Sequence, residues 1–184
     1  MIGEDGYICL TDFGLAKLLE DHVQAETFCG TPDYLAPEIL HRTGHGFPVD
    51  WWTLGILVYD MICGFPPFFT GGNNPQKMYK MIKTKPIYFP DAQRHKIYMS
   101  DNCKDFILKL LDKEAESRLG TAGDIEEVLS HPWLSEIDPQ QILEKTIEAP
   151  MKPSLSNDQL DTNNFDKQFT SEEVKVTEIP EEEM

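Results

Sequence analysis

The segment from Trp52 to Cys63 constrains the fold more than any other part of this sequence, because its residues are apolar on most sides. Pro48 lies just before the segment and Gly64 just after it, and these residue types commonly begin and end a helix. A β-strand would fit residues 56–59 alone, but not the whole segment. The sequence therefore predicts a buried central helix, with Asp50 placed to cap its first N–H groups.

Three further helices are predicted after this segment from apolar residues at helical spacing. They begin at Pro75, after the capping residue Ser100, and at Asp124. Near the N-terminus, a turn at residues 4–6 followed by apolar residues predicts a short strand at residues 7–10. Because helices dominate these elements, the expected fold class is mainly α.

The charge of the chain is strongly negative and unevenly distributed. The net charge is −16, and more than half of it lies in residues 135–184. This last part is expected to form a solvated, extended tail rather than a packed domain. A chain of this charge is also a poor binder of nucleic acids and anionic membranes, so neither is expected as a partner.

The remaining composition predicts a cytoplasmic protein. The four cysteines are well separated without metal-ligand spacing, which is typical of reduced thiols. The longest apolar run, residues 54–59, ends at Asp60 and is too short to span a bilayer. The acidic first residues contain no apolar core, so we expect no signal peptide.

The most specific sequence motif covers residues 12–38. It begins with Asp-Phe-Gly at residues 12–14 and ends with Gly-Thr-Pro-Asp-Tyr-Leu-Ala-Pro-Glu at residues 30–38. A carboxylate before a Phe-Gly turn can hold a metal ion that bridges nucleotide phosphates. An Asp-Phe-Gly alone is weak, because three common residues recur by chance. The two motifs at this spacing are specific to the activation segment of a protein kinase.

With these motifs the chain resembles the C-terminal part of an AGC-group Ser/Thr protein kinase, similar to protein kinase B, protein kinase C and the cyclic-nucleotide-dependent kinases. The resemblance covers nearly all 184 residues. It implies the large, C-terminal lobe of a kinase domain at residues 1–134 and an AGC C-terminal tail at residues 135–184. The Gly-rich loop, the phosphate-binding lysine and the His-Arg-Asp loop are not found in the sequence, and Met1 would align just past that catalytic loop.

The resemblance implies ATP and Mg²⁺ as cofactors. Asp12 matches the metal-binding carboxylate, and Thr31 matches the threonine that faces the catalytic aspartate of the family, so both are assigned to catalysis. The residues expected to lie at the nucleotide belong to the Asp-Phe-Gly turn and to a Phe-Asp-x-x-Phe motif of the tail: Asp12, Phe13, Gly14, Phe165 and Phe169. For Phe165 and Phe169, the plainer interpretation is that they are two anchoring aromatic residues in a disordered tail.

Two threonines match phosphorylation sites of the family. Thr27 lies at the position of the activating phosphothreonine, which an upstream kinase would modify. An ordinary exposed threonine is the plainer interpretation, but the context Thr-Phe-Cys-Gly-Thr-Pro favours the phosphorylation site. Thr177 lies at the turn-motif position, where Glu178 follows it in place of the usual proline.

Further matches concern the protein substrate and the core. Asp60 aligns with the acidic residue that accepts a substrate arginine, so substrates with basic residues near Ser or Thr are expected. Glu38 is expected to pair with Arg118 and to fix the geometry of the segment. The shelf for the residue after the phosphoacceptor would consist of Phe28, Pro32 and Leu35.

These matches predict a Ser/Thr protein kinase that transfers the γ-phosphoryl group of ATP, represented here by a part that is inactive alone. One alternative is a non-catalytic interaction module that competes for an upstream kinase or for substrates. Another is a pseudokinase, against which the presence of Asp12 argues.

Overall fold

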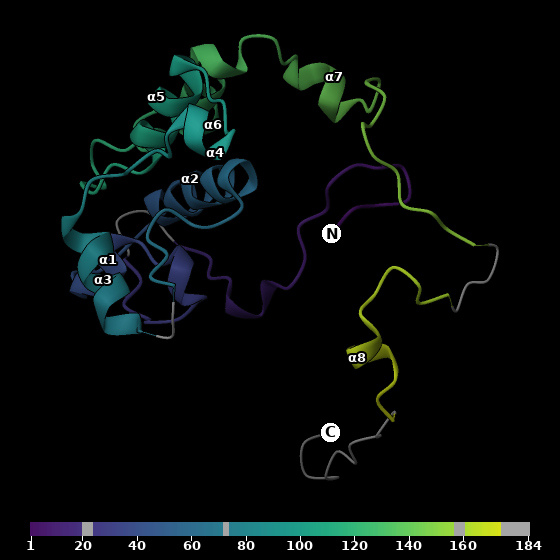
Figure 1. Cartoon of the computed structure of the whole chain (residues 1–184), viewed down its shortest axis with the longest axis horizontal. Helices are drawn as coiled ribbons and strands as arrows, with labels where there is room; N and C mark the ends of the chain where they lie inside the picture. Colours follow the sequence, from purple (N-terminus) through teal and green to yellow (C-terminus); the bar gives the residue numbers. More distant parts are fainter. Residues whose placement is uncertain (20–23, 72–73, 157–160, 174–184) are drawn as a thin grey trace. The chain divides into compact units, whose positions relative to one another are not determined.

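The computed structural model describes residues 1–19, 24–71, 74–156 and 161–173 (Figure 1). Two compact units make up the chain. The larger unit covers Asp12–Gln140, and the smaller one combines Met1–Thr11 with Gln141–Met184. The larger unit ends at Gln140, whereas the boundary expected between kinase domain and tail lies between residues 134 and 135.

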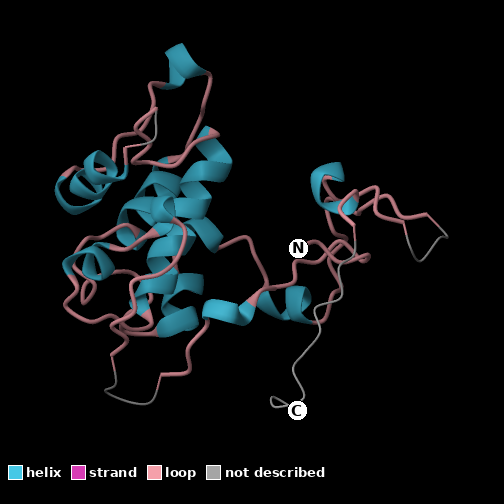
Figure 2. Cartoon of the chain, turned by 90° about the horizontal axis from the view of Figure 1, so that it is seen from below, coloured by secondary structure: helices cyan, strands magenta, loops and turns pink. Residues whose placement is uncertain are grey.

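The described residues form helices joined by loops, without a β-strand of more than one bridge (Figure 2). The α-helices are α1 (Pro37–His41), α2 (Pro48–Cys63), α3 (Pro75–Thr84), α4 (Ala92–His95), α5 (Asp101–Leu110), α6 (Asp124–Leu129), α7 (Pro139–Leu143) and α8 (Lys167–Thr170). Short 3-10 helices cover Phe13–Leu15, Pro32–Tyr34 and Pro132–Leu134. The mainly α fold class is confirmed.

The central helix is confirmed as α2, and its N-terminus differs from the expectation. The helix begins at Pro48 after Phe47, whose side chain makes no capping hydrogen bond. Asp50 lies inside the first turn rather than at the cap, so the prediction that it caps the helix is wrong. Proline at the first helical position explains the earlier start, because its fixed φ suits a helix and its missing N–H needs no cap.

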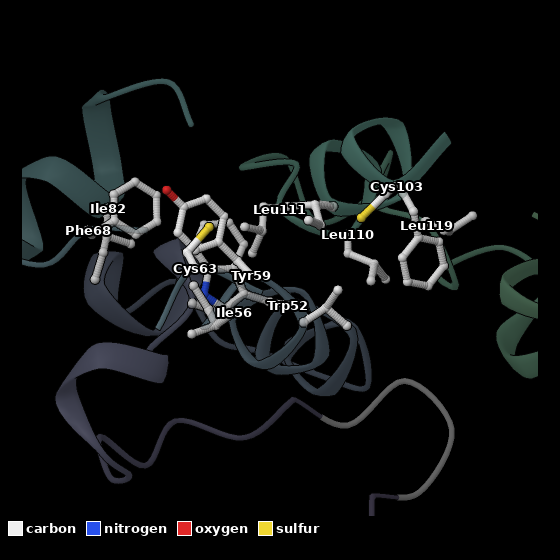
Figure 3. Packing of buried hydrophobic residues seen from close by; sticks show 14 of the residues in the cluster. Trp52, Ile56, Tyr59, Cys63, Phe68, Ile82, Cys103, Leu110, Leu111 and Leu119 are labelled. Carbon is white, nitrogen blue, oxygen red and sulfur yellow. The ribbon is translucent and has the colours of Figure 1, made fainter. Parts of the chain in front are cut away.

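The core of the larger unit lies between α2 and α5. Trp52, Ile56 and Tyr59 of α2 are buried in one cluster with Leu110 and Leu111, where α2 packs against α5 (Figure 3). Gly55 permits this approach: a Cβ atom there would lie 2.8 Å from Leu111 Cδ2 and 2.9 Å from Leu110 Cβ.

The three other predicted helices are confirmed as α3, α5 and α6, and the first two begin at a side-chain cap. Asn74 Oδ1 accepts from the N–H of Lys77 at 3.0 Å at the start of α3. Ser100 Oγ accepts from the N–H of Cys103 at 3.1 Å at the start of α5. Local side-chain capping thus sets where these helices begin.

The strand expected at residues 7–10 is wrong. The turn at residues 4–6 forms, but pairing is limited to a single antiparallel bridge between Ile2 and Ile8. It is held by backbone hydrogen bonds from Gly3 to Tyr7 and from Cys9 to Met1, at 2.8 and 2.9 Å. Apolar residues alone do not make a β-strand, because a strand also needs a neighbouring strand of similar length to pair with.

In the smaller unit, this turn packs on residues 145–152. The Tyr7 hydroxyl donates to the Ile147 carbonyl, and the Lys145 ammonium pairs with the Asp5 carboxylate. Gly6 adopts φ +86° with no space for a side chain, because a Cβ atom would lie 2.5 Å from Ala149 Cβ. Within the described part of the chain, no helix has the length and apolar character needed to cross a bilayer.

Candidate functional site

Asp12 lies in an exposed turn at the start of the segment 12–38. Its backbone is left-handed, with φ 63°, and its Oδ1 accepts from the N–H of Gly14 at 3.4 Å. Phe13 follows in a 3-10 helix and is 68% exposed. The turn therefore presents the carboxylate to solvent, where a ligand could reach it.

The residues present fit a metal ion that is shared with a nucleotide. Among the described residues, no group of three His, Cys, Asp or Glu side chains could enclose a metal. Mg²⁺ is usually bound through one or two carboxylates, with phosphate oxygens and water completing its shell. Asp12 is an exposed carboxylate of this kind, so its turn could supply one ligand of Mg²⁺ but not a cage.

The middle of the segment contacts α3 and the loop between α1 and α2. Ala25 forms an antiparallel bridge with His45, and Thr27 and Thr31 are exposed. The Phe28 ring meets Tyr79 of α3 edge-on, with a centroid distance of 6.3 Å. The backbone of the segment is therefore held near both threonines while their hydroxyls stay open to solvent.

The expected substrate shelf is not one surface. Leu35 is buried, with 4% of its area exposed, and Phe28 lines a cavity beside α3. Pro32 instead lines a different cavity of about 340 Å³, together with Asp33 and Met78. The structure thus brings Pro32 to a groove and places Phe28 elsewhere.

Asp60 lies beside this part of the segment. It is half-buried on α2, and the Tyr34 hydroxyl donates to its Oδ2 at 3.4 Å. Burial, and then the Asp60 carboxylate, raises the pKa of Tyr34 above its ordinary value. The phenol therefore stays protonated and donates to the carboxylate, which keeps one oxygen for another donor.

Glu38 and Arg118 lie together at the end of the segment. Arg118 is 1% exposed, and its Nη1 and Nη2 donate to Glu38 Oε1 and Oε2 at 2.7 and 3.0 Å. This two-bond geometry is the strong form of the ion pair. It fastens the C-terminal end of the segment 12–38 to the helical core.

The tail residues expected at the nucleotide belong to the smaller unit. Phe165 and Phe169 are 54% and 71% exposed, and Phe169 lies in α8. Asp166 Oδ1 caps this helix by accepting from Gln168 N at 2.8 Å. Thr177, the second expected phosphorylation site, lies outside the described residues.

Sequence reasoning missed two residues of the site, Tyr34 and Arg42. The Tyr34–Asp60 contact joins residues 26 positions apart and follows no periodic pattern. The Arg42 guanidinium lies 5.5 Å from the Phe28 centroid. A cation at the end of a short helix gives no sign of an aromatic partner elsewhere in the sequence.

Comparison with known families gives two matches. Residues 1–134 match the protein kinase domain, and residues 157–184 match the protein kinase C terminal domain.

Similar curated proteins are Ser/Thr kinases or are named as protein kinases. Serine/threonine-protein kinase gad8 of Schizosaccharomyces pombe is 45% identical over 170 residues, which are 91% of this chain and 28% of gad8. Serine/threonine-protein kinase YPK1 of Saccharomyces cerevisiae is 42% identical over 173 residues, covering 94% of this chain and 24% of YPK1. Protein kinase 2 of Dictyostelium discoideum is 41% identical over 172 residues, covering 94% of this chain and 34% of Protein kinase 2. The chain thus spans about a quarter to a third of the length of these relatives.

Proposed function

Because this chain belongs to the protein kinase family, and within it to the AGC group of Ser/Thr kinases, we propose that it forms part of an enzyme acting on other proteins. The enzyme transfers the γ-phosphoryl group of ATP to serine and threonine residues. The chain contributes one metal ligand and the surface that receives the protein substrate.

The observation that carries this proposal is how the segment 12–38 is held. One end is a solvent-exposed carboxylate, Asp12, and the other end is clamped by the buried Glu38–Arg118 pair. Phosphoryl transfer depends on positioning and on charge stabilisation more than on a single nucleophile. A segment that is fixed to the core and open at its metal-binding turn suits that requirement.

The cofactors in this proposal are ATP and Mg²⁺. Asp12 would hold Mg²⁺, which would supply positive charge for the transfer of the phosphoryl group. Thr31 is proposed to face the catalytic aspartate and to favour serine and threonine as acceptors. Phe13, Gly14, Phe165 and Phe169 are proposed to lie at the nucleotide.

Asp60 is proposed to select basic substrates. Its carboxylate is half-buried and accepts a single described hydrogen bond, from Tyr34, so it can also accept from a guanidinium. Pro32 is proposed to support the residue after the phosphoacceptor, because it lines a groove, whereas Leu35 is buried and Phe28 lines another cavity. The net charge of −16 would further attract basic peptides.

Thr27 is proposed to be phosphorylated by an upstream kinase, and Thr177 to be a second site. Thr27 is exposed, so a kinase can reach its hydroxyl. A phosphate adds nearly two negative charges and can order the surrounding loop.

The test is a phosphoryl-transfer assay on the native protein, which is purified from its source cells at whatever length those cells produce. A serine peptide with arginines before the serine should be phosphorylated. Asp12→Asn should lower the rate by at least about a hundredfold, because the metal loses its charged ligand. Asp101→Asn removes an exposed carboxylate on α5 and should leave the rate unchanged. No transfer by the wild type, or an equal rate in Asp12→Asn, would reject the proposal.

A further inference from the structure

Lys113 is a half-buried lysine that follows α5 and lies against the core of the larger unit. Its Nζ is 4.8 Å from the centroid of the Phe68 ring and 5.7 Å from that of the Trp52 ring. These two residues are 2% and 0% exposed. Among the residues that the structure describes, no carboxylate forms an ion pair with Lys113. The amino group thus lies beside buried rings instead of extending into water.

The hydrogen bond that Lys113 makes does not require a charged amine. Its Nζ donates to the carbonyl of Ile82, in the last turn of α3, where helix carbonyls lack a donor from their own helix. A neutral amine keeps two N–H groups, so it can make the same bond and still carry a free lone pair. The contact with α3 therefore persists when the ammonium loses its proton.

The carboxylate next to Lys113 in sequence is engaged elsewhere. Asp112 accepts from the N–H of Glu114 at 3.0 Å and from the Ser117 hydroxyl at 2.9 Å. Burial lowers the pKa of Lys113 from 10.5 to about 8, and Asp112 raises it by a smaller amount. At about pH 7.5, roughly a quarter of the Lys113 amines are then neutral, against about one in a thousand for a lysine with a pKa of 10.5.

Lys113 also lines an open cavity of about 660 Å³. The cavity lies between α1, the loop before α2 and the loop after α5. The other titratable side chains of its lining are Glu38, His41, His45, Lys83, Glu114 and Glu116. The Glu38 carboxylate is bound by Arg118. A small molecule that enters this cavity would reach a lysine whose amine is held beside the apolar core, which is the setting that makes lysines nucleophilic.

We propose that Lys113 is an acylation site, modified at Nζ by an acyl thioester or an acyl phosphate. The lone pair of the neutral amine attacks the carbonyl carbon and forms a C–N bond. The bond from that carbon to the sulfur of the thioester or the oxygen of the phosphate breaks, and a thiolate or a phosphate leaves. The attacking nitrogen loses its proton to water. The proposal does not rest on phosphoryl transfer, since it concerns this amine alone.

The surroundings of Lys113 favour the acylated product. The product is a neutral amide, which a half-buried site beside two aromatic rings accommodates at a lower cost than a charged ammonium. The amide keeps one N–H, which can donate to the Ile82 carbonyl as the amine does. Acylation therefore removes the charge that faces Phe68 and Trp52 without removing the donor that Ile82 needs.

The test measures the acetylation rate of each lysine in the full chain, whose fold is first checked by circular dichroism. The chain is incubated with acetyl-CoA or with acetyl phosphate, then unfolded and treated with deuterated acetic anhydride, so that mass spectrometry gives the fraction modified at each position. At about pH 7.5, Lys113 should react at least about tenfold faster than the exposed Lys96. Between about pH 8.5 and 9.5 the Lys113 rate should rise less than about twofold, whereas the Lys96 rate should rise about tenfold.

Two further arms identify the cause and the donor. In urea that unfolds the chain, Lys113 and Lys96 should react within about twofold of each other, because the rings and the cavity no longer surround Lys113. A faster Lys113 rate with acetyl-CoA than with acetyl phosphate assigns a thioester as the donor, and the reverse assigns an acyl phosphate; both results support the site. The proposal is overturned if Lys113 in the folded chain reacts no faster than Lys96, if the two rates rise in parallel with pH, or if the advantage of Lys113 persists in urea.

Discussion

Arg118 and Glu38 are 80 positions apart in sequence and form a buried, two-bond ion pair. The guanidinium also donates to the carbonyls of Asp112 and Pro48, at 3.0 and 2.8 Å. Its carbon lies 5.2 Å from the Trp52 ring centroid. A buried charge is tolerated when its hydrogen-bonding groups are satisfied, and these contacts satisfy the guanidinium. One side chain thereby joins α1, the start of α2 and the loop after α5.

Removing this guanidinium should destabilise the larger unit strongly. Arg118→Met leaves the Glu38 carboxylate without its partner and leaves two carbonyls without a donor. We expect a loss of about 3–5 kcal/mol in the free energy of unfolding, measured with urea. Arg94→Met, on the exposed helix α4, should change it by less than about 0.5 kcal/mol. Similar values for the two variants would show that the pair contributes little to the fold.

Two left-handed glycines provide a matched pair. Gly120 has φ +93°, and a Cβ atom there would lie 2.5 Å from Trp51 Nε1, whereas Gly64 has φ +79° and open space around it. Alanine costs about 1–2 kcal/mol at either position because of its backbone conformation. At Gly120 the contact with the Trp51 ring should add about 1–3 kcal/mol. Urea unfolding of the two variants measures this difference, and equal losses would contradict the packing described for Trp51.

Lys113 should make stability depend on pH in the alkaline range. Its ammonium lies 4.8 Å from the Phe68 centroid and donates to the Ile82 carbonyl. Burial lowers the pKa of Lys113 from 10.5 to about 8, and the neighbouring Asp112 carboxylate raises it by a smaller amount. Between these pH values the unfolded chain binds more protons than the folded one, so the free energy of unfolding rises with pH.

The comparison for Lys113 is with Lys113→Met, which cannot titrate. The wild type should gain stability relative to this variant as the pH rises from 8 to 10.5, in urea unfolding at several pH values. Lys96→Met, at an exposed lysine, should keep the pH dependence of the wild type. Parallel curves for the wild type and Lys113→Met would mean that the ammonium is not destabilised by burial.

Four helices of the larger unit, α2, α3, α5 and α6, could be predicted because their signals are local. Pro75 and Ser100 mark helix starts within a few residues of the apolar positions that follow. The apolar run of α2 is too long for a β-strand, so it predicts a helix. The strand at residues 7–10 could not be judged in this way, because a strand depends on a partner that the sequence does not identify. The cap of α2 was misjudged because Pro48 and Asp50 are both start signals, and the proline decides the first turn.

The site was predictable where a motif names the residue and unpredictable where packing decides. The spacing from Asp12 to Glu38 and the match of Arg118 come from the linear sequence. Placement of Phe28 against Tyr79 and Arg42, away from Pro32, depends on where α1 and α3 lie, and these helices are packed against each other (Figure 1).

The most direct test of the central claim is a phosphoryl-transfer assay on the purified chain of 184 residues by itself, after circular dichroism has shown that it is folded. The claim is that these residues supply the metal carboxylate and the substrate surface, while the Gly-rich loop, the phosphate-binding lysine and the His-Arg-Asp loop are not among them. We predict no transfer from ATP to an arginine-containing serine peptide above the background without protein. Transfer by the chain alone that is lost in Asp12→Asn and kept in Asp101→Asn would contradict the claim.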